Sequence, residues 1–483
     1  MNASRATKLV ETVKSMILVV LFALTILLLY FFWGSTPFKD LIRENPPQYE
    51  TIGLAAMLQP DYVCIHLGGE SYAVAEKKFS MMMDCVRAFS ESRNLSIQSI
   101  EKEGYDEISK YRSMKAVFSY YVPFSAICEA FGVDRIAGAD SVDALSELVY
   151  IADFDDQMYV ADKRANKYYR VTGSSSDSFR ALKEEIDAAE GRASYFPLAT
   201  YMGGEVDNSA LCPVSHESSI NGAPFEPDGF SKQDEKATGI VKSFFSDNFD
   251  FVKRIEEKNG TTIYMYGYGR TVVIAHSDGA LEFKREDDDR AAAQIRYLDA
   301  LERVDAFIAA HGAFEPIYGM ELTPYVKDVT IDPGGKRGFR FVFGVEIGGS
   351  RVFYQSGEPV VFDVIGGRVS YFKRDLINVN SSDLSASIGK NRVVFPAFDL
   401  LWANLEYVAD VLEENLQAGA GDTSFDGVVG KVSRFECGYV RAGQDAGSLE
   451  AAWAVTIGGI DFYFGLDDGV PMGYRQGQQG GGG

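Results

Sequence analysis

The sequence predicts an α+β protein: one N-terminal transmembrane helix, an α/β-mixed domain, and two repeated domains in which a helix lies on an antiparallel sheet. Three observations support this. Residues 16–33 are apolar and uncharged. Strand-like and helical patterns then mix through residues 61–191. A pattern of one helix and one glycine-centred hairpin occurs twice in the last half of the chain, shifted by 110 residues from Phe343 to Trp453.

Composition narrows the class of protein. A chain of 483 residues is too long for one hydrophobic core and corresponds to roughly two to four domains. Hydrophobic residues make up 46% and charged residues 24%, as in a folded chain. Aromatic residues make up 13%, which favours strands. Because a net charge of -22 repels nucleic acid, we expect no nucleic-acid partner.

Residues 16–33 (MILVVLFALTILLLYFFW) predict one membrane-spanning helix. As a helix this run is about 27 Å long, close to the thickness of a hydrocarbon core. Three basic residues precede it, Arg5, Lys8 and Lys14, with only Glu11 to offset them. By the positive-inside rule, residues 1–15 are cytoplasmic and the bulk of the chain is extracellular. We therefore expect a single-pass protein of the cell membrane.

A cleaved signal peptide is the alternative interpretation of this segment. Signal peptides have a shorter apolar run, of about 7–15 residues, followed by small residues at the cleavage site. Here the run is longer and leads into Gly34-Ser35-Thr36-Pro37-Phe38, a poor cleavage site. An uncleaved anchor is therefore the favoured interpretation.

Breaks in the pattern predict how the chain is divided. Prolines crowd residues 34–60, and Gly, Pro, Ser, Asn and Asp gather in 202–236, as in linkers. The predicted order is a cytoplasmic tail (1–15), the transmembrane helix (16–33), a juxtamembrane stalk (34–60), an N-terminal extracellular α+β domain (61–200), a linker (201–238), a middle α+β domain (239–378), a C-terminal α+β domain (379–474) and a disordered Gly-rich tail (475–483).

The elements of the N-terminal domain follow from periodicity and turn signals. Asp153-Phe-Asp-Asp156 separates two strand-like runs and predicts a hairpin. The predicted elements are strands at 62–66, 115–122, 147–151 and 157–161, and helices at 76–92, 124–131 and 178–190.

The internal repeat predicts two domains of one fold. Residues 343–354 (FGVEIGGSRVFY) resemble residues 453–464 (WAVTIGGIDFYF), with Ile-Gly-Gly identical in both. Gly-Gly between two apolar runs predicts a two-residue hairpin, because glycine readily adopts the positive φ of such turns. Helical periodicity at 290–310 and at 397–417 precedes the two hairpins.

The cysteines and histidines predict no metal site. The five cysteines, Cys64, Cys85, Cys128, Cys212 and Cys437, form no C-x-x-C motif. A Cys64–Cys85 disulfide stays open for an oxidising compartment, and buried free thiols are the simpler interpretation. Cys64 and His66 share one strand face, so a metal pair is conceivable, but a packed pair is favoured because no further ligands lie nearby.

No catalytic, cofactor-binding or metal-binding residue is predicted. His276-Ser277-Asp278 contains the residue types of a catalytic triad, but triad members meet through folding rather than as neighbours, and Asp278-Gly279 is typical of a hairpin turn. The acidic runs at 153–156, 286–289 and 467–468 do not have the spacing of a calcium loop. We therefore expect a protein that is not an enzyme.

Three stretches carry a resemblance to a known family. They are Lys115–Ser125 with Leu148–Ile151 in the first domain, Phe245–Phe249 with Thr262–Tyr264 and Asp278–Phe283 in the middle, and Ala452–Thr456 with Phe462-Tyr463 at the end. With the basic start and single transmembrane helix, this order resembles the YycH-type regulatory proteins and the related YycI type. The five cysteines, the Gly-rich tail and the long segment 202–236 depart from the family's pattern, which suggests a distant member.

The resemblance implies a regulatory role without catalysis. Such proteins lie beside a membrane sensor histidine kinase of the WalK/YycG type, in a two-component system, with a YycI-like companion, and modulate the kinase through transmembrane and outer-domain contacts. Within residues 16–33 the small or weakly polar positions Ala23 and Thr25, with Tyr30 near the outer end, are the candidate transmembrane contacts. The alternative that this helix only anchors the chain, without contacting a partner helix, stays open, because no G-x-x-x-G motif is present.

Two other classes of function stay open at this point. One is an exported peptide- or wall-fragment-binding, chaperone-like module that accepts an added strand at an open sheet edge. The other is an envelope hydrolase whose site follows no recognisable motif; a cluster of His66 or His276 with carboxylates in a pocket would favour it.

Overall fold

The computed structural model describes residues 14, 16–26 and 49–476, apart from 75–77, 92–95, 134–135, 137, 155–156, 174–176, 215–216, 219, 228, 232–233, 287–293, 383–391, 416–421 and 442–446. The chain divides into two compact units, residues 1–48 and 49–483. In the first, residues 16–26 are helical. Among the described residues, no helix is both long and apolar enough to cross a membrane. Residues 27–33 of the predicted transmembrane helix lie outside the described residues.

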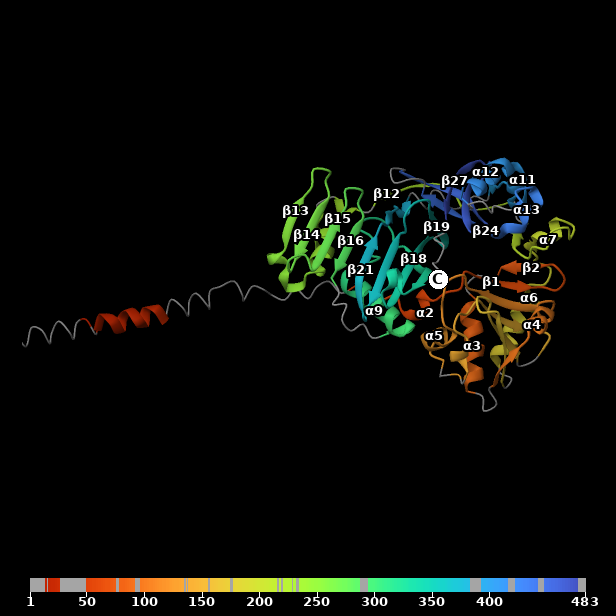
Figure 1. Cartoon of the computed structure of the whole chain (residues 1–483), viewed down its shortest axis with the longest axis horizontal. Helices are drawn as coiled ribbons and strands as arrows, with labels where there is room; N and C mark the ends of the chain where they lie inside the picture. The colour runs from red at the N-terminus through yellow and green to blue at the C-terminus, as the bar shows by residue number, and fades with distance from the viewer. Residues whose placement is uncertain are drawn as a thin grey trace, which may run out of the picture. The chain divides into compact units, whose positions relative to one another are not determined.

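The N-terminal part of the second unit is built on a sheet of nine described strands, all antiparallel to their neighbours (Figure 1). Their order is β3-β7-β6-β5-β4-β1-β2-β8-β9. The strands are β1 (Tyr62–His66), β2 (Tyr72–Val74), β3 (Ser96–Ile100), β4 (Ser113–Val117), β5 (Glu147–Ile151), β6 (Gln157–Asp162), β7 (Lys167–Thr172), β8 (Tyr195–Pro197) and β9 (Leu211–Pro213). The predicted hairpin is confirmed as the β5–β6 pair.

Helices cover both faces of this sheet. α3 and α6 pack together, and α6 buries Phe179, Leu182 and Ile186 at the spacing of an amphipathic helix. On the other face α4 buries Tyr105 against Tyr159 and Tyr168. The helices of this region are α2 (Leu54–Met57), α3 (Phe79–Ser90), α4 (Lys102–Ile108), α5 (Phe124–Ala130), α6 (Asp177–Ala188) and α7 (Leu198–Tyr201), with a 3₁₀ turn η2 (Ala139–Ser141).

One predicted strand in this region is too long. β4 ends at Val117, whereas the apolar pattern predicted a strand to Val122. Phe118, Tyr120 and Val122 are still buried, but as irregular chain that leads into α5 at Pro123. The predicted helix 124–131 is confirmed as α5, and Gly132 follows it with a φ of 66°.

The second sheet contains fourteen described strands and joins the predicted middle and C-terminal domains. The order is β13-β14-β15-β16-β21-β20-β18-β19-β24-β25-β26-β27, with β17 on β18 and β11 on β25. The strands are β11 (Ala223–Pro224), β13 (Lys253–Glu256), β14 (Thr262–Tyr266), β15 (Thr271–Ala275), β16 (Leu281–Arg285), β17 (Thr323–Ile331), β18 (Gly338–Ile347), β19 (Ser350–Tyr354), β20 (Val360–Ile365), β21 (Arg368–Arg374), β24 (Val432–Arg441), β25 (Ser448–Ile457), β26 (Ile460–Gly465) and β27 (Pro471–Gln476).

The two repeat copies contain matching hairpins. β18 and β19 turn at Gly348-Gly349, with φ of 58° and 83°, and β25 and β26 turn at Gly458-Gly459, with φ of 61° and 81°. The predicted two-residue Gly-Gly turns are therefore confirmed. The copies differ beyond the hairpin, because β27 extends its own meander, whereas β19 pairs in parallel with β24 of the other copy.

Helices α8 and α9 pack together, and α9 contacts β18, β20 and β21. α9 begins at Tyr297, later than the predicted Arg290, so residues 294–296 are not helical. The predicted helix 397–417 is two helices, broken where Asn404 Nδ2 donates to the carbonyls of Leu400 and Gly469. The helices are α8 (Glu235–Ser243), α9 (Tyr297–His311), α11 (Ala397–Ala403), α12 (Leu405–Asn415) and α13 (Phe425–Lys431), with 3₁₀ turns η3 (Gly229–Ser231), η4 (Ser246–Phe251) and η5 (Pro333–Gly335).

Residues 201–238, predicted as a linker, contribute pairing to several parts of the second unit. β9 pairs at the end of the first sheet and β11 pairs with β25. Two small ribbons join this segment to later ones: β10 (Glu217–Ser218) with β23 (Arg392–Val393), and β12 (Glu226–Pro227) with β22 (Ile377–Asn378). The segment is therefore tied to the fold by hydrogen bonds along its length.

A cluster of charges connects the two sheets. Arg351 on β19 donates to the carbonyl oxygen of Asp61 over 2.9 Å, and its guanidinium lies 4.5 Å from the ring centre of Tyr325. Arg351 Nε lies 3.2 Å from Glu436 Oε1, and Arg434 Nη1 lies 3.6 Å from Asp61 Oδ1. The Arg351 and Asp61 side chains are only 11% and 8% exposed, so this contact is largely shielded from water.

Candidate functional site

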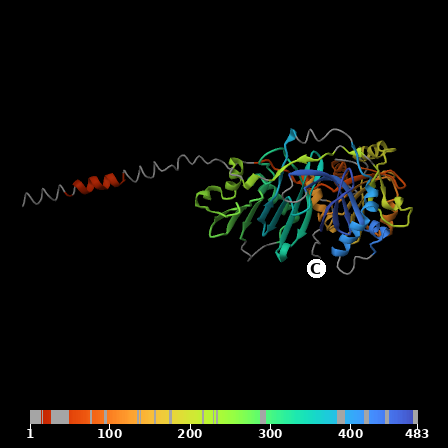
Figure 2. The ribbon, with the colours of Figure 1, turned by 90° about the horizontal axis from the view of Figure 1, so that it is seen from above.

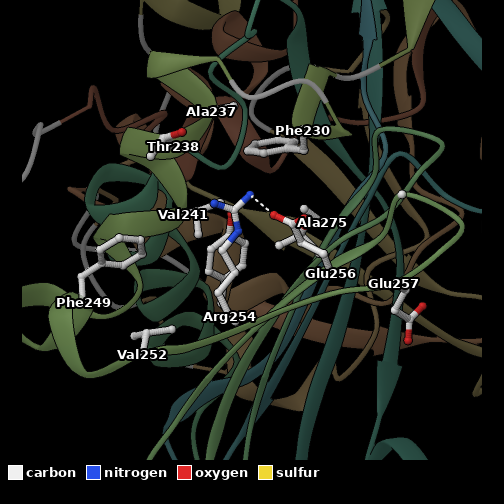
Figure 3. Close-up of a pocket in the computed structure, with 13 residues that line it drawn as sticks. Phe230, Ala237, Thr238, Val241, Phe249, Val252, Arg254, Glu256, Glu257 and Ala275 are labelled. Atoms are coloured by element: carbon white, nitrogen blue, oxygen red, sulfur yellow. Dashed lines mark ion pairs between the residues drawn. The ribbon is translucent and has the colours of Figure 1, made fainter.

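A groove lies on the helix-covered face of the second sheet, at the end formed by β13, β14 and β15 (Figure 3). Its volume is about 340 Å³. In Figures 1 and 2 these strands, coloured green, lie at one end of the sheet. The groove is lined by the aromatic and aliphatic side chains of Phe230, Val241, Phe249, Val252 and Tyr264, and by the polar residues Thr238, Arg254, Glu256, Glu257 and Thr262.

Helix α8 forms one wall of the groove, and its local sequence explains how it starts. Asp234 is the N-cap and accepts a hydrogen bond from the backbone N–H of Lys236 over 2.7 Å. This bond, followed by the bond from the Tyr318 hydroxyl, lowers the pKa of Asp234. The helix buries Ala237, Ile240 and Val241, while Thr238 on its flank lines the groove.

The floor of the groove carries two opposite charges on one strand. Arg254 and Glu256 are two residues apart on β13 and therefore share a face of the sheet. Their side chains form an ion pair of 2.7 Å between Nη2 and Oε1, drawn as a dashed line in Figure 3. With 43% and 63% of the two side chains exposed, this pair contributes little to stability and can exchange partners at low cost.

His66 and His276, the two histidines considered in the sequence analysis, are not among the residues that line the groove. His66 is 2% exposed, and its two ring nitrogens lie 2.8 Å and 2.9 Å from the carbonyl oxygens of Tyr111 and Gly69. Both nitrogens are therefore occupied by backbone. His276 Nε2 lies 3.4 Å from Glu282 Oε1 at the β15–β16 hairpin, which is the turn predicted at Asp278-Gly279. No cluster of three metal-binding side chains occurs in the part of the chain that the structure describes.

Ser243 and His311 form a serine–histidine pair that the sequence did not predict. Ser243 Oγ lies 2.9 Å from His311 Nδ1. The same hydroxyl donates to the carbonyl oxygen of Ile240 over 2.6 Å, so its proton is already used and the imidazole N–H must donate to it. Burial, and then the charge of Arg285, lower the pKa of His311 to about 4. In this arrangement the histidine does not take a proton from the serine.

All five cysteines are free thiols, and Cys64, Cys85, Cys128 and Cys212 are buried. Burial raises the pKa of Cys64 to about 11 and that of Cys85 to about 12. The structure therefore has no Cys64–Cys85 disulfide, and thiols with such pKa values are weak nucleophiles.

The predicted transmembrane contacts lie in the first unit. Ala23 and Thr25 are within the described helical residues, and the Thr25 hydroxyl donates to the carbonyl oxygen of Leu21 over 2.8 Å. This bond occupies the donor of Thr25 within its own helix. Tyr30 lies outside the described residues.

Comparison with solved structures shows which fold the chain has. No family model and no curated protein matches the chain. Among solved structures, the chain is similar to one with which it aligns over 88% of its own length and 98% of the other chain, at a TM-score of 0.57 and 10% identity. That structure is YycH from Bacillus subtilis, so the chain has a YycH-like fold. A weaker likeness, at a TM-score of 0.31 and 11% identity, is to an uncharacterized protein from Eubacterium rectale, covering 53% of this chain and 82% of that one.

Sequence reasoning named no residue as a groove residue. The lining comes from three separate segments, at 230–241, 249–264 and Ala275, which only the folded sheet and helix bring together. One signal was available: Phe249 and Thr262–Tyr264 belong to stretches that carry the family resemblance.

Proposed function

We propose that this chain is a membrane-anchored, non-catalytic accessory protein that modulates a sensor histidine kinase of a two-component system. The observation that carries the proposal is the YycH-like fold, which extends over 88% of the chain. The family resembled in sequence regulates kinases of the WalK/YycG type. The uncharged run at 16–33, with its basic flank, supports an anchor whose N-terminus is cytoplasmic and whose bulk is extracellular.

An accessory protein can change kinase activity only if it binds two states of the kinase with different affinity. The outer part of this chain suits such a role, because charge pairs and the β19–β24 strand pairing tie its parts together. Asp61 and Arg351 connect the first sheet to the second, and Arg441 connects the two repeat copies. A bound kinase would therefore meet a firm surface rather than loosely tethered domains.

The proposal is tested by reconstituting the full-length chain with the sensor kinase of its own organism in proteoliposomes. The measurement is the rate of kinase autophosphorylation with and without the chain. We expect a change of several-fold in this rate and co-purification of the two proteins. An unchanged rate together with no co-purification would refute the proposal.

The contribution of the anchor is tested separately. Replacing residues 16–33 by leucine keeps an apolar helix but removes Ala23, Thr25 and Tyr30. We expect the variant to lose modulation while it stays in the membrane fraction. Full modulation by this variant would refute a helix-specific contact and leave the outer domains as the regulatory surface. The matched control is Leu18→Ile within the same run, which keeps all three residues.

A further inference from the structure

The outer side of β13 is an open strand edge. β13 is the end strand of the fourteen-stranded sheet, and no described strand pairs with its outer side. The N–H of Glu257 donates to the carbonyl of Thr261 in the adjoining hairpin over 2.8 Å. Because hydrogen bonding alternates along an antiparallel strand, Ile255 also faces β14, and the backbone groups of Arg254 and Glu256 face outward. Two N–H groups and two carbonyls are thus available at this edge.

The charges on this edge are self-complementary. Residues 253–257 read Lys-Arg-Ile-Glu-Glu, so the sign of charge reverses about Ile255. If a second copy pairs antiparallel with Ile255 opposite Ile255, then Arg254 faces Glu256 and Lys253 faces Glu257, each pair occurring twice. Opposite charges directly across a strand pair are stabilising, and like charges are destabilising.

The same register satisfies the backbone. Arg254 and Glu256 are the outward-facing residues, and in this register each lies directly opposite the other, which allows four hydrogen bonds between the strands. Shifting the register by two residues places Arg254 opposite Arg254 in one direction and Glu256 opposite Glu256 in the other. Both shifted registers therefore put like charges opposite each other, which is destabilising. The pairing centred on Ile255 is therefore favoured by both hydrogen bonds and charge.

We infer that β13 is a homodimerisation edge at which two copies of this chain join their sheets about a two-fold axis. Charged side chains on an edge strand often prevent association. In this register, however, each charge lies opposite one of the other sign, which stabilises the strand pair. Here the local charges cancel, although the whole chain carries a net charge of -22. Phe251, 78% exposed just before β13, would contact the partner's β13–β14 turn in this arrangement. Arg254 and Glu256 also line the groove, so the partner's strand would border its open side.

Charge reversal tests the pairing. The dissociation constant of the full-length chain in detergent is measured by sedimentation equilibrium, up to roughly 200 µM because a four-residue edge buries little area and pairs weakly. We expect Arg254→Glu and Glu256→Arg, each alone, to weaken the dimer by at least about ten-fold, since like charges then face each other at two symmetric places. The double variant restores opposite charges and should return within about three-fold of the original constant.

Lys102→Glu is the matched control, because it reverses a charge and breaks an exposed ion pair, with Asp106 on α4, away from the edge. It should leave the dimer unchanged. A monomeric original chain, a double variant that stays dissociated, or an equal effect of Lys102→Glu would each overturn the inference. A sedimenting mass equal to one copy of the chain with a bound foreign peptide would also overturn the inference.

A cross-link provides a second measurement that does not depend on charge. Ile255→Cys places two thiols opposite each other across the axis, so mild oxidation should give a reducible dimer. Ser99→Cys, exposed on the end strand β3 of the other sheet, and the unmodified chain are the controls. Equal cross-linking in all three would refute the register. If the Arg254→Glu variant is monomeric and still modulates the kinase, the proposed function holds and does not require the dimer.

Discussion

Arg441 and Asp375 form a buried ion pair between the two repeat copies, with 2.7 Å between Nη1 and Oδ1. Arg441 belongs to β24, and Asp375 follows β21. The arginine is 4% exposed and lies above the rings of Phe225 and Tyr354. Removing one partner of such a pair leaves a charge in a dry environment, which costs far more than the pair itself contributes.

Asp375→Ala should therefore lower the free energy of unfolding by about 3–5 kcal/mol. Asp375→Asn, which keeps a hydrogen-bond acceptor, should cost less. The measurement is urea unfolding followed by circular dichroism. Asp106→Ala, which removes the partner of Lys102 in a surface pair, should change the same free energy by less than about 1 kcal/mol. Equal losses of unfolding free energy in Asp375→Ala and Asp106→Ala would contradict the prediction that burial makes the Arg441–Asp375 pair costly to break.

His311 should make stability depend on pH. Burial and the charge of Arg285 lower its pKa to about 4, while in the unfolded chain it is near 6.5. Above about pH 6.5 the side chain is neutral in both states, so its contribution is fully present. As the pH falls from there to about 4, the unfolded chain binds the proton first and stability is lost, by about 2 kcal/mol between pH 7.5 and 5.0.

The measurement is urea unfolding of the original chain and of His311→Phe at these two pH values. The variant keeps the ring stacked on Phe244 and should lose this part of the pH dependence, while carboxylate contributions cancel in the difference. Ser243→Ala removes the hydrogen bond to His311 but keeps the imidazole, so it should retain the slope. An identical slope in His311→Phe would contradict the prediction.

Gly459 and Gly104 should respond to alanine in opposite directions. Neither position has any atom within 4 Å of the Cβ that alanine would add, so only the backbone differs. Gly459 has a φ of 81° in its hairpin turn, and alanine there should cost about 1 kcal/mol. Gly104 lies in α4, where alanine should stabilise by about 0.5 kcal/mol. Thermal unfolding distinguishes the two, and a loss at both sites would refute the backbone explanation.

Gly438 should be intolerant of a side chain. It lies on β24 beside the parallel strand β19, and a Cβ there would overlap the carbonyl oxygen of Arg351 and lie 2.8 Å from Phe353 Cε2. We expect Gly438→Ala to destabilise by about 1–3 kcal/mol, and to separate the unfolding of the two repeat copies into distinct steps. Gly430→Ala in α13, whose Cβ would meet Val206 at 3.7 Å, is the control and should not destabilise.

Local chemistry made several elements predictable from sequence. Gly348-Gly349 and Gly458-Gly459 identify their hairpins because the turn needs positive φ at both positions. The same signal was overlooked once, at Ile365-Gly366-Gly367, which closes the β20–β21 hairpin. Helix ends were predicted less well, since Asn404 breaks a continuous helical pattern by bonding to the distant carbonyl of Gly469.

Long-range pairing could not be predicted. The parallel contact of Val352 with Tyr439 joins segments whose sequences say nothing of each other. The groove depends on the same kind of information, because Phe230 and Tyr264 come from separate segments that line one groove only in the folded chain. The charge pattern around Ile255 was visible in the sequence, but its meaning required knowing that β13 is an end strand.

The pairing of Ala223 with Leu449 has a consequence for how the chain folds as it is synthesised. Residues 208–227 are synthesised long before the later strands and carbonyls that they bind. Asn208, for example, donates to the carbonyl oxygens of Val429 and Val432, which are synthesised more than 200 residues later. During that interval the segment presents unsatisfied backbone to any neighbour. A nascent chain stalled before residue 449 would therefore be a natural client for chaperones and a target for proteases.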